Sequence, residues 1–228
     1  FAAAHGAAHL GAAVPDGFSP IYRWLVAIST ATYGFLALIM GIDLARRGGV
    51  GESAVPAGSA VLLASSLPVY MYLVPFHVHA LAAFSTALFF WWGFARVPGW
   101  QARHWFVWGM CAGLMAIVYY VQAVFLIVVA WRLAARGAWR DRTAPAAVFA
   151  AGMLPFAALH LMSRAALYGS ATTTNYRDGF FWFSPRLWAT AFSPEHGLFL
   201  WTPVVALALA GLVGLARRQA HARVMLAA

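Results

Sequence analysis

Charge is scarce in this chain. Only 9% of its 228 residues are charged and 63% are hydrophobic, whereas charged residues make up about 25% of a soluble globular domain. The composition therefore excludes an ordinary soluble domain and indicates a membrane protein with several spans. Its apolar runs have helix length, about 20 residues, and differ from the roughly 10-residue alternating segments of an outer-membrane barrel. We expect an all-α polytopic membrane protein that forms a single transmembrane domain over residues 1–228.

Lysine is absent and cysteine occurs once. All 15 basic residues are arginines in short segments between the apolar runs, where they set membrane topology, so we expect no nucleic-acid partner. The single cysteine, Cys111, excludes an intrachain disulfide and a thiolate metal site, and we expect it to pack inside an apolar helix. Phosphate-cradling glycine loops, Gly-x-Ser-x-Gly elbows and His-Glu-x-x-His helices are also missing, which argues against the common soluble enzyme classes.

Seven segments are predicted to cross the membrane, two of them short. They cover Tyr22–Ala45, Ala54–Val74, His79–Ala95, two arms within Trp105–Trp131, Ala144–Ala166 with a kink at Pro155, and Pro194–Ala216.

The run Trp105–Trp131 is predicted to break near Tyr119–Gln122. As one helix it would place arginine-rich segments on opposite sides of the membrane, against the positive-inside rule. As two arms of about 14 residues, each falls short of the roughly 30 Å hydrocarbon core. Because non-helical backbone at membrane depth is tolerated only inside protein or beside a water-filled cavity, this turn is expected to line a cavity.

This topology places eleven arginines on the inner side and four on the outer side. The four outer ones are Arg23, Arg164, Arg177 and Arg186. Asp43 is expected to pair with Arg46 and Arg47 at the inner surface. The segments gathered on the outer face are the His77–His79 link, the turn at Tyr119–Gln122, a long polar and aromatic loop over 168–192, and Glu195 with His196.

Three groups on that face are candidates for binding a substrate. His77 and His79 flank Val78. Three roles stay open for them: polar residues at the membrane interface, contacts to a ligand or phosphate, or metal ligands that lack a third partner. Arg177 can hold a phosphate bidentately, although a solvated ion pair with Asp178 is the simpler alternative. Tyr119, Tyr120 and Gln122 place polar groups at membrane depth, where such groups tend to be functional.

Glu195 and His196 put an acid and a base side by side at the mouth of the last predicted span. Helix initiation explains part of this pattern. Ser193 suits an N-cap, Pro194 the first helical position, and Glu195 the first turn, where its charge complements the helix dipole.

The stretch Phe192–Pro203 resembles a signature of bacterial type C glycosyltransferases related to glycosyltransferase family 39, the protein mannosyltransferase and aminoarabinose transferase group. Its letters are Phe-Ser-Pro-Glu-His-Gly-Leu-Phe-Leu-Trp-Thr-Pro. Further stretches are similar to that family in the expected order: Asp16–Pro20, Thr32–Leu36, His79–Phe84 and Ala166–Ser170.

The resemblance implies an enzyme of the bacterial inner membrane that transfers a sugar from a polyprenyl-phosphate donor to a lipid, glycan or protein acceptor on the periplasmic face. Its catalytic Asp or Glu is expected in a first outer loop upstream of Phe1, so these 228 residues are expected to be inactive alone. Arg177 and His79 are expected to contact the phosphate, with Tyr120, Glu195 and His196 lining the cavity. The resemblance requires no cofactor, although a divalent cation stays open.

Two other functions stay open at this point. A polar cavity between short helices also suits a transporter or flippase for lipid-linked sugars. A non-catalytic membrane subunit is the third reading, with His77, His79 and His160 as haem or metal ligands. Within the main reading, His160 is expected to form a hydrogen bond between helices.

Overall fold

The computed structural model describes residues 2–12, 14–75, 77–94, 99–171, 186–195 and 197–217. Within these ranges every regular element is helical, which confirms the all-α prediction. The chain divides into two compact units, residues 1–96 and 97–228. The first contains α1 (Ala2–Ala7), η1 (Ala8–Ala12), α2 (Pro20–Ala45), η2 (Arg46–Val50), η3 (Gly51–Ser53), α3 (Ala54–Leu63), η4 (Val69–Leu73) and α4 (His79–Gly93). The second contains α5 (Ala102–Val118), η5 (Tyr120–Leu126), α6 (Ile127–Ala134), α7 (Trp139–Tyr168), α8 (Leu187–Phe192), α9 (Leu198–Trp201) and α10 (Val204–Ala216).

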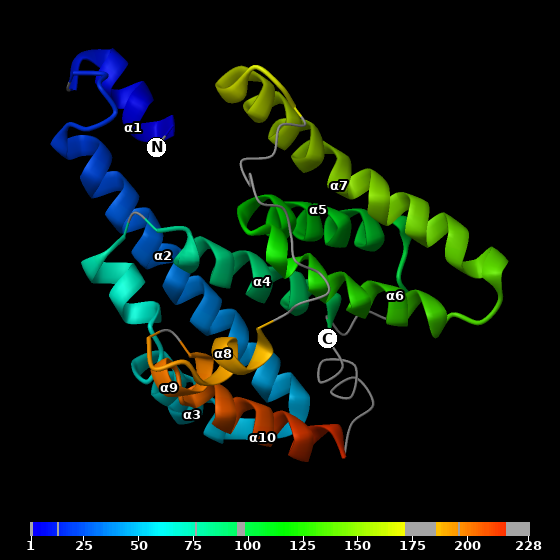
Figure 1. Cartoon of the computed structure of the whole chain (residues 1–228). Coiled ribbons are helices and arrows are strands. Elements are labelled where there is room, and N and C mark those ends of the chain that lie inside the picture. The colour runs from blue at the N-terminus through cyan, green and yellow to red at the C-terminus, as the bar shows by residue number, and fades with distance from the viewer. Residues whose placement is uncertain are drawn as a thin grey trace. The chain divides into compact units, whose positions relative to one another are not determined.

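Helix α2 organises the first unit, since α1, α3, η4 and α4 all pack against it (Figure 1). Its C-terminal end is tied to α4 through Asp43, which accepts a hydrogen bond from the indole nitrogen of Trp91 at 2.6 Å and forms an ion pair with Arg47. The predicted pairing of Asp43 is thereby confirmed for Arg47. Arg46 pairs with Glu52 instead, at 3.4 Å.

The second unit is built on the packing of α5 against α7 (Figure 1). Two glycines allow the close approach. A Cβ added to Gly109 would lie 2.0 Å from the carbonyl oxygen of Phe149, and one added to Gly152 would lie 2.1 Å from the carbonyl oxygen of Phe106. Small residues at a helix crossing let the backbones meet, as is common between membrane helices. Cys111 is buried in α5, as predicted.

Arginines and tryptophans join the two arms predicted within Trp105–Trp131. The guanidinium of Arg132, near the end of α6, lies 4.0 Å from the ring centroid of Trp100, and that of Arg136 lies 5.6 Å from Trp105. The end of the second arm therefore lies beside the start of the first, and the arms form an antiparallel hairpin. The break is at Tyr119, whose backbone is extended (φ −152°, ψ 99°), which confirms the predicted position.

Two helices in the described ranges are long and apolar enough to cross a membrane: Pro20–Gly48 and Trp139–Tyr168. Only 17% and 11% of their most apolar 18-residue windows are buried. Large side chains such as Ile39 and Met162 are exposed on them. A soluble protein would bury such a helix, so this exposure suits a lipid surrounding better than water. Helix α7 also continues through Pro155 without a break.

Two of the predicted spans are interrupted. The segment Ala54–Val74 ends its first helix at Leu63, and helical backbone returns only near Pro68. Ser65 closes this gap by accepting a hydrogen bond from the backbone nitrogen of Leu67 at 3.2 Å, a local bond that competes with the helix. The predicted span is therefore not one continuous helix, because serine and proline together outweigh the apolar composition.

The last predicted span, Pro194–Ala216, is interrupted by Pro203, which separates α9 from α10. Proline lacks the backbone N–H, and it excludes Thr202 from helical geometry (φ −135°, ψ 67°). Ser193 is also not an N-cap. It follows the end of α8, and Gly197 caps α9 instead.

Candidate functional site

The link between η4 and α4 carries the histidines predicted to bind a substrate, and α2 holds this link in place. The hydroxyl of Thr30, a buried residue, donates a hydrogen bond to the carbonyl oxygen of Pro75 at 2.7 Å. Gly34 lies one turn further along α2 and faces Met71, whose sulfur would be 2.3 Å from an added Cβ. These two contacts place η4 and the link against the middle of α2.

His77 and His79 form an aromatic cluster with Tyr70. The Tyr70 ring centroid lies 4.2 Å from that of His79 and 5.6 Å from that of His77, and the two imidazoles are stacked 5.9 Å apart with 11° between their planes. His77 is exposed and His79 is half-buried. Because an imidazole lone pair lies in the ring plane, two stacked rings cannot direct lone pairs at one metal ion. The arrangement therefore favours hydrogen bonds to a ligand over metal binding by this pair.

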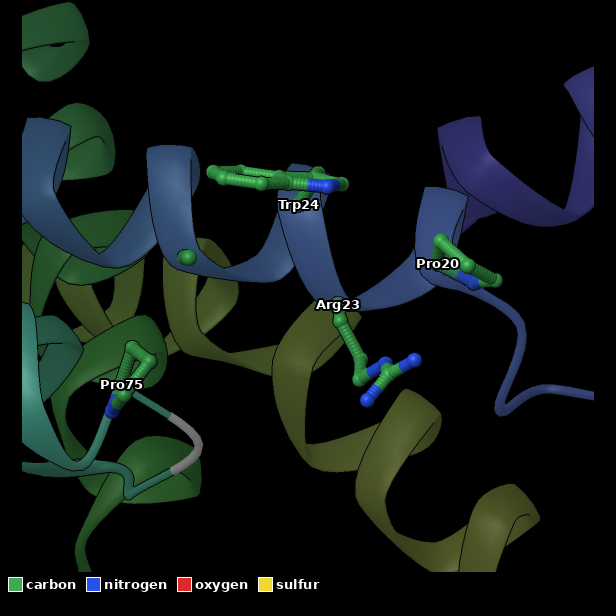
Figure 2. A pocket seen from close by; sticks show the side chains of 5 residues that line it. Pro20, Arg23, Trp24 and Pro75 are labelled. Atoms are coloured by element: carbon green, nitrogen blue, oxygen red, sulfur yellow. The ribbon is translucent and has the colours of Figure 1, made fainter.

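A pocket of about 400 Å³ opens beside the same link (Figure 2). Its lining consists of Pro20, Arg23, Trp24 and Ala27 from α2 and Pro75 from the link. Figure 2 shows Arg23 and Trp24 leaving α2 in different directions, with Pro75 opposite the helix. The pocket thus combines one permanent cation with an apolar wall, and Pro75 is two residues from His77.

Arg23 lies in the first turn of α2, about 5 Å along the axis from Pro20, and forms no ion pair among the residues that the structure describes. Arginine and tryptophan at the end of an apolar helix are typical of the headgroup level of a membrane. A cation that no carboxylate neutralises is a suitable partner for a phosphate.

The acid nearest to Arg23 in the sequence, Asp16, is already occupied. Its carboxylate accepts hydrogen bonds from the backbone nitrogens of Phe18 and Ser19, both at 2.8 Å. These hydrogen bonds stabilise the ionised carboxylate and so hold the pKa of Asp16 below its ordinary value. The bond from Phe18 has the largest effect. Asp16 therefore closes the turn that starts α2.

The second unit holds the predicted residues of the hairpin turn. Tyr119 and Tyr120 are exposed, with ring centroids 6.2 Å apart, while Gln122 is half-buried. The backbone nitrogen of Gln122 donates to the carbonyl oxygen of Tyr119 at 2.9 Å, so a local turn holds the three together. Polar tips at a helix break agree with the prediction for this segment. His77 and His79 belong to the first unit. That they share an outer face with this turn stays a prediction.

Glu195 lies in an exposed turn between α8 and α9. The Ser193 hydroxyl bonds to its carboxylate, and its backbone nitrogen donates to the Ser193 oxygen at 3.2 Å. Glu195 is thus part of a local serine turn and not of a helix's first turn. The other three predicted residues of this region, Arg177, Asp178 and His196, lie outside the described residues.

Two features differ from the sequence-based interpretation. The pocket at Arg23 was missed, although an arginine and a tryptophan three and four residues after Pro20 are a readable interfacial signal. His160, expected to form a hydrogen bond between helices, is exposed on α7, and its side chain forms no hydrogen bond within the described residues. Composition alone does not show which side of α7 meets α5.

Comparisons of the chain with protein-family models, curated proteins and solved structures found no match.

Proposed function

We propose that this protein is an integral membrane glycosyltransferase, which transfers a sugar from a polyprenyl-phosphate donor to a lipid, glycan or protein acceptor. The observation that carries this proposal is the pocket at the start of α2, where Arg23 lies among Pro20, Trp24, Ala27 and Pro75. A lipid-linked phosphate needs one cation for its headgroup and an apolar wall for its chain. This pocket supplies both at the end of a helix that is apolar enough to cross a membrane.

The histidine link supports the same assignment. His77 and His79 lie two and four residues after Pro75 in the chain, and Tyr70 packs on both rings. Imidazole groups and a phenol can donate hydrogen bonds to phosphate oxygens. The signature-like stretch Phe192–Pro203 gives independent support from the second unit.

In the proposed reaction, Arg23 and His79 bind the donor phosphate and stabilise the charge that develops on it as the glycosidic bond breaks. The acceptor is deprotonated by an Asp or Glu carboxylate, as the resemblance implies. The other predicted substrate-binding residues belong to the second unit and stay predictions: Tyr119, Tyr120, Gln122, Arg177, Asp178, Glu195 and His196. The proposed setting is the bacterial inner membrane, with seven spans and the active face toward the periplasm.

The test uses the full-length enzyme in proteoliposomes with a set of polyprenyl-phosphate sugars. Loss of a hydrogen bond to a charged group costs about 1.5–3 kcal/mol, so Arg23→Gln should lower kcat/KM for the donor about 10- to 100-fold. Arg23→Lys keeps the charge and should recover part of the loss. His79→Ala should also lower transfer while the protein still inserts into the membrane.

Arg46→Gln is the matched control, because Arg46 lies at the other end of α2, about 35 Å from Arg23 along the axis. It should transfer sugar at the wild-type rate. Wild-type rates in both Arg23→Gln and His79→Ala would refute the proposal. Movement of an intact lipid-linked sugar across the bilayer without transfer would identify a transporter instead.

A further inference from the structure

A second histidine pair lies in the first unit, away from the His77–His79 link. His5 belongs to α1 and His9 to η1, and four residues of helical chain bring their side chains to the same face. Their Nε2 atoms are 3.1 Å apart, and their rings are perpendicular, with centroids 4.5 Å apart. We propose that His5 and His9 together chelate a transition-metal ion of the zinc type through their Nε2 atoms.

The distance between the two nitrogens suits this role. A zinc–nitrogen bond is about 2.0–2.1 Å long, so two imidazole nitrogens on one tetrahedral zinc are about 3.3 Å apart. In the structure the two nitrogens share a hydrogen bond at 3.1 Å, so a metal ion that replaces the shared proton needs only a small change in their spacing. The perpendicular rings also matter, because their planes intersect and one ion can lie in both. The stacked rings of His77 and His79 do not meet this condition.

Tyr22 orients the first ligand. Its hydroxyl lies 2.6 Å from Nδ1 of His5, and its ring is buried in a cluster with Ala4 and Ala8. When Nδ1 carries the proton and donates it to this hydroxyl, the Nε2 lone pair of His5 accepts the hydrogen bond from His9, and a metal ion would take the place of that proton between the two rings. Metal-bound histidines are oriented in this way by a hydrogen bond from the other ring nitrogen.

The donor set indicates which metals bind. Imidazole nitrogens suit Zn²⁺, Cu²⁺ and Ni²⁺, whereas Mg²⁺, Ca²⁺ and Mn²⁺ prefer oxygen ligands. His9 is exposed, so water or an external ligand can complete the coordination. With two protein ligands, the site binds more weakly than a structural zinc site, which has four. This site is independent of the proposed sugar transfer.

The test is a titration of the purified, tag-free full chain with zinc chloride, in competition with a chromogenic chelator. The wild type should bind one equivalent, and His5→Ala and His9→Ala should each abolish this binding. His9 is exposed, so its variant keeps the fold, which size-exclusion chromatography checks. Tyr22→Phe should weaken zinc binding about 10- to 100-fold while leaving one site.

The control is the double variant His77→Ala/His79→Ala, which removes the other histidine pair and should still bind one equivalent of zinc. Cobalt should give visible d–d absorption with the wild type and with this control, and none with His9→Ala. No zinc uptake by the wild type, unchanged uptake by both single variants, or loss of zinc in the control would each overturn the proposal.

Discussion

Substitution of Gly109 by alanine should separate α5 from α7. The added Cβ would lie 2.0 Å from the carbonyl oxygen of Phe149 and 3.1 Å from the Cα of Gly152, whereas ordinary contact begins at 3.4 Å. The obstacle is backbone, which cannot rotate away as a side chain can. The two helices must therefore move apart by about 1.4 Å at the crossing, enough to lose more than half of the dispersion energy of nearby contacts, since a gap of about 0.5–1 Å already loses a quarter to a half.

Overpacking of this kind costs about 1–3 kcal/mol. Replacing a helical glycine by alanine returns about 0.5–1 kcal/mol, because the unfolded chain loses freedom. The net effect on the free energy of unfolding should be a loss of about 1–2 kcal/mol. At about 2–4 °C per kcal/mol for a chain of this size, the midpoint of thermal unfolding in detergent should fall by roughly 2–8 °C.

Gly41 is the matched control, because it is also a helical glycine, but an added Cβ there would meet no other described element within 4 Å. Gly41→Ala should leave the midpoint unchanged or raise it. The double variant Gly109→Ala/Gly152→Ala should cost less than the sum of its parts, since one separation of the helices accommodates both methyl groups. Equal midpoints for Gly109→Ala and Gly41→Ala would refute the described packing of α5 on α7.

Three further changes test single contacts. Thr30→Val should lower the free energy of unfolding by about 1 kcal/mol in thermal denaturation, because the carbonyl of Pro75 loses its donor. Arg132→Gln should lower it by about 0.5–2 kcal/mol, since the cation over the Trp100 ring is removed. The pKa of Asp16, followed by NMR titration, should lie below its usual 3.8; its stabilisation of the turn should be present above about pH 4 and be lost as the pH falls through that lowered pKa.

Each of these three changes has a control variant. Thr30→Ser keeps the hydroxyl and should remain near wild type. Arg103→Gln removes an exposed arginine that makes no ion pair in the described part of the chain, and should have no effect. Asp16→Asn keeps an acceptor without its charge, so it should keep part of the turn and remove the pH dependence. Equal losses in either stability pair, or an Asp16 pKa at or above 3.8, would contradict the contacts described.

Local chemistry made several elements predictable. The apolar run of α2, the start of α4 at His79, and the break at Tyr119 depend on neighbouring residues or on where the arginines lie along the chain. The interruptions at Ser65 and Pro203 were missed, although their signals are also local. In both cases the apolar composition was given more weight than the serine or proline that ends the helix.

The candidate sites depend on contacts between distant residues. Thr30 and Pro75 are 45 residues apart, and His5 and Tyr22 are 17 apart. Helices that are apolar on all sides carry no periodic signal of the face that packs, so the sequence does not indicate these partners. By itself the sequence determined the helical, membrane-suited composition and most helix positions, because these follow from local preference. Only the tertiary structure decided that Arg23 lines a pocket, that His5 meets Tyr22 and that Gly109 meets Gly152, because such pairs form only when helices pack in one register.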